Sequence, residues 1–317
     1  MLRRRHLIAA GLAAPALARA QSNSLRLIVP YAAGGPTDIQ ARILAETLPP
    51  FLESRVVVEN RTGAGVMVGT DAVAKAAPDG QTALLTTVAH AVNPSLMPSL
   101  PYDTEKDFAP VALVAKVPLV VLVRKDLPVA DMRGFLDWLK SRNGQAVYGS
   151  AGVGSAPHLG TALLLMMAGL EAVHIPYRGS APAMTDLAAG RIDFYIDAAA
   201  SGLAQARAGM GRAIAWSMLT RSEVAPELPT IAESGVPGYE AYTWSGVFFP
   251  AGTPREMVQR LNAATRQAVA EPRLRARFAE LGAELAEPAP PEALGQFVTQ
   301  EIAKWREVVR RSGMSTQ

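Results

Sequence analysis

A regular alternation of short apolar segments with segments of helical spacing constrains this chain most, and it runs from Leu25 to Arg311. Buried strands are typically about four to eight apolar and β-branched residues long, whereas amphipathic helices repeat an apolar residue every third or fourth position. Strands that alternate with helices pair in parallel, so the pattern predicts an α/β fold with helices covering parallel sheets. The expected strands are 25–30, 56–59, 82–88, 111–123, 147–150, 173–175, 192–196, 213–218 and 244–249. The expected helices are 37–48, 69–75, 132–139, 157–168, 182–189, 254–270, 273–281 and 291–311, the first of them stopped by Pro49 and Pro50.

The length of 317 residues and the order of these segments predict two α/β lobes. A second strand and helix series begins after Pro118, and the last three helices have no strands of their own, so we expect them to pack back on the first lobe. The second lobe is then inserted into the first, with crossings near 117–121 and 242–246. We expect a signal peptide at 1–20, a first lobe at 21–119 and 244–317, and a second lobe at 120–243.

The N-terminal segment has the pattern of a secretory signal peptide. Arg3, Arg4 and Arg5 precede an apolar stretch, 7–17, which is followed by the small-residue triplet at 18–20. We expect cleavage near Ala20 and export to the periplasm, by either the general secretory or the twin-arginine route. No later segment has eighteen uninterrupted apolar residues, so the mature protein is expected to be soluble.

Charge and composition exclude several classes of function. Of 31 basic residues, 4 lie in the first twenty positions, which leaves 27 against 28 acidic residues and no basic stripe for a nucleic-acid partner. The chain has no cysteine, which excludes disulfides, cysteine-ligated metals and thiol catalysis. His90, His158 and His174 lack the spacing of a metal site. We expect no metal and no cofactor.

Two glycine-containing loops link a strand to a helix in a way that suits an anion. The first is Tyr31-Ala32-Ala33-Gly34-Gly35-Pro36-Thr37-Asp38, and the second is Ser150-Ala151-Gly152-Val153-Gly154-Ser155. Glycine permits close approach of the backbone, and the free N–H groups at a helix start attract negative charge. Neither loop has a Walker or dinucleotide-binding spacing. One such loop in each lobe, facing across a cleft, predicts a carboxylate site that needs no buried arginine.

Polar residues elsewhere leave other readings open. Arg178 offers a charged hydrogen bond to a carboxylate or is a solvated loop residue, and Asp197 accepts from a ligand or caps a strand end. A hydrolase would need Ser155, His158 and a distant aspartate in contact, but the G-x-S-x-G elbow is absent. His158 is instead expected to satisfy backbone groups or close the pocket wall.

Several segments together resemble the substrate-binding proteins of the tripartite tricarboxylate transporters, the Bug family. The resemblance runs in order from about Leu25 to Gly313. The matching segments are Val29-Pro30-Tyr31-Ala32-Ala33-Gly34-Gly35-Pro36-Thr37-Asp38, Val58-Glu59-Asn60-Arg61-Thr62-Gly63-Ala64-Gly65, Ala77-Pro78-Asp79-Gly80, Asn93-Pro94-Ser95-Leu96, Leu100-Pro101-Tyr102-Asp103, Tyr148-Gly149-Ser150-Ala151-Gly152, Pro157-His158-Leu159, Ile175-Pro176-Tyr177-Arg178-Gly179-Ser180-Ala181-Pro182 and Pro250-Ala251-Gly252-Thr253-Pro254.

The resemblance implies a type II periplasmic binding protein fold, with two α/β lobes around a ligand cleft, and no enzymatic activity. It implies capture of a small mono- or dicarboxylate, largely through backbone groups and ordered water at 33–38 and 150–155, and delivery to the membrane permease subunits of a tripartite transporter. The chain departs from the family at Val66-Met67 and at Ala198-Ala199-Ala200, so no particular acid is implied. We expect a monomer.

The candidate ligand-binding residues are Tyr31, Ala33, Gly34, Gly35, Pro36, Thr37, Asp38, Thr87, Ser150, Ala151, Gly152, Gly154, Ser155, Arg178 and Asp197, with no catalytic and no metal-binding residue. Two alternatives to a transport receptor remain open at this point. One is an α/β enzyme that acts on a carboxylate substrate, and the other is a sensor that presents its ligand to a membrane receptor.

Overall fold

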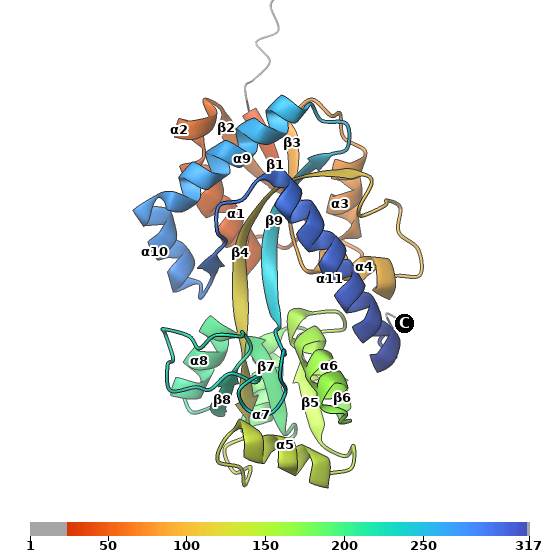
Figure 1. Cartoon of the computed structure of the whole chain (residues 1–317), viewed down its shortest axis with the longest axis vertical. Helices are drawn as coiled ribbons and strands as arrows, with labels where there is room; N and C mark the ends of the chain where they lie inside the picture. Colours follow the sequence, from red (N-terminus) through yellow and green to blue (C-terminus); the bar gives the residue numbers. More distant parts are fainter. Residues whose placement is uncertain (1–23, 316–317) are drawn as a thin grey trace, which may run out of the picture.

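The computed structural model describes residues 24–315 and shows two groups of strands and helices connected by two long strands (Figure 1). The expected signal peptide and its cleavage near Ala20 lie outside the described residues. None of the described helices is both long enough and apolar enough to cross a membrane.

The first lobe is built on three parallel strands. Strand β1 pairs with both β2 and β3, with Leu27 opposite Val58 and Ile28 opposite Leu84. The strands are β1 (Ser24–Val29), β2 (Arg55–Asn60) and β3 (Thr82–Thr87), and the helices that follow them are α1 (Pro36–Thr47), α2 (Pro49–Leu52), α3 (Met67–Ala74) and α4 (Ala89–Leu96).

The second lobe repeats this design with β5 at the centre, parallel to β6 and β7. Its strands are β5 (Val147–Ser150), β6 (Val173–Pro176), β7 (Phe194–Ala198) and β8 (Arg212–Trp216). Its helices are α5 (Met132–Ser141), α6 (Ala156–Ala168), α7 (Ser180–Ala188) and α8 (Ala199–Arg207). The expected α/β alternation is therefore present in both lobes.

Two antiparallel strands cross between the lobes, β4 (Phe108–Val123) and β9 (Tyr242–Pro250). They complete the strand order β2-β1-β3-β9-β4-β7-β5-β6, and β8 and the short β10 (Glu284–Leu285) also pair with β4. The parallel pairing predicted from the alternation is found within each lobe, and the crossing strands add antiparallel pairs. Strand β4, expected at 111–123, continues through Pro118, which stands where the pairing passes from β9 to β7.

The three C-terminal helices pack on the first lobe, as predicted. Helix α9 (Arg255–Ala270) contacts β4 and α2, α10 (Pro272–Glu280) contacts α1, and α11 (Pro291–Ser312) contacts β4 and α4. Helix α11 also reaches α6 of the second lobe. The lobe boundaries expected at 119/120 and 243/244 fall within β4 and β9, and they stay a prediction.

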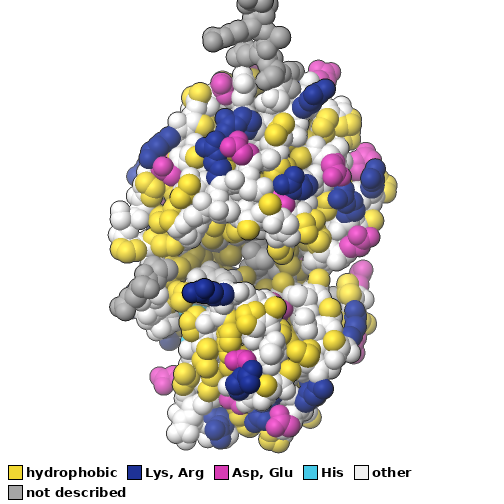
Figure 2. All heavy atoms as spheres, turned by 180° about the vertical axis from the view of Figure 1, so that it is seen from behind, with side chains coloured by type: hydrophobic (Ala, Val, Ile, Leu, Met, Phe, Trp, Pro, Cys, Tyr) yellow, Lys and Arg dark blue, Asp and Glu magenta, His cyan; other side chains and the backbone are white. Residues whose placement is uncertain are grey.

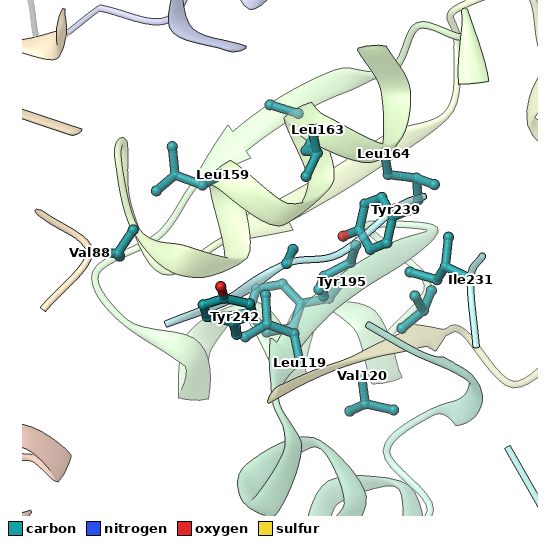
Figure 3. Packing of buried hydrophobic residues seen from close by; sticks show 14 of the residues in the cluster. Val88, Leu119, Val120, Leu159, Leu163, Leu164, Tyr195, Ile231, Tyr239 and Tyr242 are labelled. Atoms are coloured by element: carbon teal, nitrogen blue, oxygen red, sulfur yellow. The ribbon is translucent and has the colours of Figure 1, made fainter. Parts of the chain in front are cut away.

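Apolar side chains from the crossing strands form part of one buried cluster (Figure 3). Leu119 and Val120 of β4 lie in this cluster with Tyr195 of β7. The hydroxyl of the fully buried Tyr239 donates to the carbonyl of Gly160 at 2.9 Å, which joins the segment before β9 to α6. The second lobe is thus fixed to the strands that lead into it.

Helices α2, α4 and α8 were not predicted. Helix α4 contains Pro94 and a fully buried His90 between the rings of Phe108 and Phe248, which hides its helical pattern. At the end of α1, Pro49 and Pro50 do not simply stop a helix; they begin α2, because proline suits the first helical turn.

We expect Glu301 to be a major stabilising residue of α11. Its buried carboxylate accepts from the indole N–H groups of Trp244 (2.9 Å) and Trp305 (2.8 Å). Glu301→Ala leaves two buried donors unpaired and should lower the free energy of unfolding by about 2–4 kcal/mol in a denaturant titration. The matched variant Glu307→Ala, on an exposed face of the same helix, should change it by less than about 1 kcal/mol. Equal losses in the two variants would contradict this role.

Candidate ligand-binding site

A cavity of about 630 Å³ lies between the two lobes and is lined by residues from both (Figure 2 shows the hollow between them). The predicted site residues that line it are Tyr31, Gly34, Pro36, Thr37, Thr87, Ala151, Gly154, Ser155 and Asp197. Strands β4 and β9 contribute its apolar floor through Val117, Leu119 and Trp244. The structure thus brings parts of both glycine loops to one cleft.

Five helices begin at this cleft. Pro36 and Ala89 start α1 and α4 in the first lobe, and Ala156 and Ser180 start α6 and α7 in the second, where Ala200 of α8 also lines the cleft. Each of these helices follows a strand of a parallel set, so the strands' carboxyl ends and the helix starts share one edge. Helix N-termini carry free N–H groups and partial positive charge, which suits an anion.

Most of these helix starts have no side-chain cap. The residues that precede α1, α4, α7 and α8 are Gly35, Val88, Gly179 and Ala198, and none accepts a capping hydrogen bond through its side chain. Helix α6 differs, since Ser155 Oγ accepts from the His158 N–H at 3.4 Å. Backbone donors at four of the five helix starts are therefore left to other acceptors.

Among the described residues that line the cleft there is no lysine, arginine or histidine. The two charged residues are Asp197 and the exposed Glu280. Among these lining residues, the hydrogen-bond donors available to an anion are backbone N–H groups and neutral polar side chains. Arg178 is exposed and does not line the cavity.

Asp38 lies beneath the first loop rather than in the cleft. Its carboxylate accepts from the Gly34 N–H at 2.8 Å, from Arg42 Nε at 2.9 Å and from Asn60 Nδ2 at 2.9 Å. Asn60 Nδ2 also donates to the Tyr31 carbonyl at 3.0 Å. Burial alone would raise the pKa of Asp38, but the hydrogen bonds from Arg42, Gly34 and Asn60 bring it to about 2. The aspartate therefore holds the loop in place.

The rest of the first loop gives the cleft its shape. Gly34 has a φ of 79°, which favours glycine, whereas Gly35 has an ordinary φ of −76° and precedes α1. Ala33 is exposed, and neither Ala33 nor Gly35 lines the cavity. Tyr31 and Thr87, from the ends of β1 and β3, share a hydrogen bond of 2.6 Å between their hydroxyl groups, and burial raises the pKa of Tyr31.

The second loop is held by its own hydrogen bonds. Ser150 is buried, and its hydroxyl contacts His174 Nε2 at 2.7 Å. Ser155 Oγ donates to the Gly152 carbonyl at 2.7 Å, and the Gly154 N–H donates to His158 Nδ1 at 3.2 Å. Ser150 and Gly152 therefore shape the loop without lining the cavity.

His158 satisfies a backbone group, as expected, and does not activate Ser155. Burial and then the nearby His174 lower the pKa of His158 to about 3, so its ring is neutral. Its Nδ1 already accepts from Gly154, and the Ser155 hydroxyl faces a backbone carbonyl. The contact between nucleophile and base that the hydrolase alternative requires is not formed by these two residues.

Asp197 lies at the second-lobe side of the cleft and is held by two serines that the sequence did not single out. Ser180 Oγ donates to one carboxylate oxygen at 2.9 Å, and Ser201 Oγ donates to the other at 2.7 Å. The Tyr195 hydroxyl in turn donates to Ser180 at 2.8 Å. Burial raises the pKa of Asp197. Ser180 follows Gly179 at a helix start, a pattern that resembles the two predicted loops.

One further unpredicted residue in the cleft is Gln40 of α1. Its amide oxygen is buried and has no hydrogen-bond partner among the described residues.

The sequence analysis named two segments at which this chain departs from the family pattern. In the segment 198–200, Ala198 and Ala200 line the cleft. Val66 and Met67, at the start of α3, do not line it.

Comparison with known proteins places this arrangement in a family. The family model described as the tripartite tricarboxylate transporter family receptor matches residues 40–314. Protein BugT of Bordetella pertussis is 38% identical over 307 residues, which cover 96% of this chain and 94% of that protein.

Two solved structures with bound acids are similar along nearly their whole length. MatC from Rhodopseudomonas palustris with bound malate has 34% sequence identity and a TM-score of 0.76, over 90% of this chain and 98% of that one. Rpa4515 of the same organism with adipate has 34% identity and a TM-score of 0.79, over 92% and 98%. The predicted fold class, an α/β type II periplasmic binding protein fold of two lobes around a ligand cleft, is confirmed.

The pKa of Asp38 predicts a pH-dependent contribution to stability. Because its folded-state pKa of about 2 lies below the ordinary 3.8, its stabilisation is present above about pH 4 and is lost as the pH falls toward 2. Asp38→Ala should cost about 2 kcal/mol of unfolding free energy at pH 7, and this cost should shrink between pH 5 and pH 3. Denaturant titrations across this range provide the measurement. A cost that stays constant with pH would show that the charge of Asp38 is not what holds the loop.

Proposed function

This chain belongs to the tripartite tricarboxylate transporter receptor family, whose members are periplasmic solute-binding proteins and not enzymes, and we propose that it captures a small organic acid in the cleft. The proposed ligand is a mono- or dicarboxylate held between the two lobes. The proposed destination is the set of membrane permease subunits of a tripartite tricarboxylate-type transporter.

The convergence of five helix starts on a cleft without a basic side chain carries this proposal. Each helix start contributes roughly half a unit of positive charge and several N–H donors, so a carboxylate is stabilised without the desolvation of a buried cation. A nucleotide carries several phosphate charges, and this cleft lacks the lysines and arginines that phosphate groups usually contact.

The acids bound in the two structural neighbours, malate and adipate, support a dicarboxylate in particular. Helix starts lie on both sides of the cleft, so each lobe can bind one carboxylate group of the ligand. The apolar side chains of Val117 and Leu119 then contact the carbon chain between the two carboxylates. Asp197 lines the cleft, and each of its carboxylate oxygens accepts from one serine and keeps a further lone pair for a hydroxyl or amine on the ligand.

For the ligand contacts we propose the cleft-lining parts of the two loops, together with Thr87, Gln40 and Asp197. The predicted residues that do not line the cleft affect binding only through the conformation of the two loops; they are Ala33, Gly35, Asp38, Ser150 and Gly152. Arg178 is not proposed as a ligand contact. Export with cleavage near Ala20 and a monomeric state belong to the same proposal.

A panel of carboxylates tests the ligand class. In a thermal-shift measurement, malate, adipate, succinate or benzoate should stabilise the protein, by roughly 2.7 kcal/mol at a hundredfold excess over the dissociation constant. Glucose and ATP are the controls. Stabilisation by a control and by none of the acids would contradict the proposal, and mass spectrometry of recovered ligand that had been chemically altered would support the enzyme alternative.

A charge placed at one helix start tests the mode of binding. Ala89 is the first residue of α4 and lines the cleft, so Ala89→Asp puts a carboxylate where the ligand's carboxylate is proposed to lie. The new aspartate should leave stability unchanged or slightly raised, because acids favour helix starts, while carboxylate affinity falls by about tenfold or more. The uncharged control Ala89→Asn should change affinity by less than about threefold. Equal affinity of the two variants in isothermal titration would show that this helix start does not hold the anion.

A further inference from the structure

A glycine in the C-terminal part of the first lobe meets the second lobe directly at the edge of the cleft. Gly282 lies between α10 and β10, with a φ of 65°. A Cβ atom added there would lie 2.8 Å from Ala200 Cβ and 3.1 Å from the Ala200 backbone nitrogen. Real Cβ atoms do not approach other heavy atoms as closely as 2.8 Å, so only a glycine fits at this position without separating the two segments.

The two residues belong to different lobes. Gly282 is tied to the first lobe by β10, since Glu284 pairs with Lys116 and Leu285 with Ala115 of β4. Ala200 is the second residue of α8, which follows β7 of the second lobe. Leu281 and Ala200 both line the cleft and are partly exposed, so the contact between residues 282 and 200 lies at the edge of the cleft, which we call its mouth.

A second glycine contact joins the lobes across the same cleft. Gly154, which follows β5 in the second lobe and has a φ of 75°, packs against the Leu96 side chain at the end of α4. The tip of a leucine can turn aside, whereas Ala200 Cβ and backbone nitrogen cannot move without moving α8. Gly282 therefore sets the stricter limit on how close the lobes come.

We propose that the absence of a side chain at Gly282 lets the lobes close on the ligand, which makes Gly282 a positioning residue for ligand capture. This inference rests on the proposed function, because it concerns the closure of the same carboxylate site. Helix starts of both lobes reach one small acid only when the lobes are close together. A side chain at 282 holds the mouth open, and it also covers the N-terminal backbone of α8 that lines the cleft.

Replacement of Gly282 also strains the backbone, so the test needs a control with the same strain. Gly169 follows α6, has the same φ of 65°, and a Cβ added there meets no atom within 4 Å. Gly282→Ala and Gly169→Ala therefore share the cost of an L-residue at positive φ and differ in the contact with Ala200.

Isothermal titration with malate and adipate measures the effect on capture. Gly282→Ala should weaken the binding of whichever acid the wild-type protein binds by about tenfold or more, because the open form becomes more populated, while Gly169→Ala should weaken it by less than about twofold. Adding Ala200→Gly to Gly282→Ala removes the nearest atom and should restore part of the affinity. Equal affinities for Gly282→Ala and Gly169→Ala would overturn the proposal.

A cross-link tests the contact without any ligand. The chain has no cysteine, so a pair introduced by Gly282→Cys and Ala200→Cys is unique. A slight separation of the lobes brings the two Cβ atoms into the range of about 3.5–4.5 Å that a disulfide needs. The pair should form an intramolecular disulfide on mild oxidation, and much faster than Gly169→Cys with Ala200→Cys, because no atom of Ala200 lies within 4 Å of a Cβ at 169.

The titration and the cross-link together distinguish the closure contact at Gly282 from the proposed ligand class. A disulfide in the 282–200 pair, together with no binding of any carboxylate by the wild-type protein, supports the closure contact and overturns the proposed ligand class. Carboxylate binding by the wild-type protein without this disulfide, and with full affinity in Gly282→Ala, supports the ligand class and overturns the closure contact.

Discussion

The parallel pairing of strands within each lobe is the constraint on which the binding site depends. Strands β1, β3, β5, β6 and β7 each lead into a helix that starts at the cleft, because parallel strands place their carboxyl ends on a common edge. The proposed anion site is therefore a property of topology more than of particular side chains. Side chains such as Asp38, Asn60 and His158 hold the turns between strand and helix, and in the proposed binding mode the backbone faces the ligand.

The crossing strands β4 and β9 give this arrangement its second property, a cleft that two lobes share. Their antiparallel pairing extends from Phe108 to Pro118 on one strand and from Tyr242 to Pro250 on the other. Helix α11 also connects the two lobes, since it contacts both β4 and the second-lobe helix α6. Small residues at the edges of the cleft, Gly154 and Gly282, let the two halves meet there.

Much of the fold could be predicted from sequence because strand and helix patterns are local. The strand at 147–150 and the last three helices were predicted nearly to their ends. The two crossing strands were also predicted, but their antiparallel pairing was not, because it joins segments more than a hundred residues apart and no local pattern marks it. Helix α4 was missed because Pro94 and the buried His90 obscure its period.

The candidate site was predictable to a similar degree. Glycine loops before helices are visible in the sequence, and residues of both loops line one cleft. Whether a loop residue faces the ligand or supports the loop depends on tertiary contacts, as the hydrogen bonds of Asp38 and Ser150 show. Ser180 follows a glycine at a helix start, as the predicted loops do, whereas Ser201 and Gln40 have no distinctive motif. The approach of Gly282 to Ala200 joins positions that only the folded chain brings together.

A crystal structure of the protein with the carboxylate that stabilises it most tests the central claim directly. The account predicts carboxylate oxygens within hydrogen-bond distance of backbone N–H groups at helix starts of both lobes, with no lysine, arginine or histidine nitrogen within about 4 Å. A ligand carboxylate paired with the guanidinium of Arg178, or bound away from the helix starts, would contradict it.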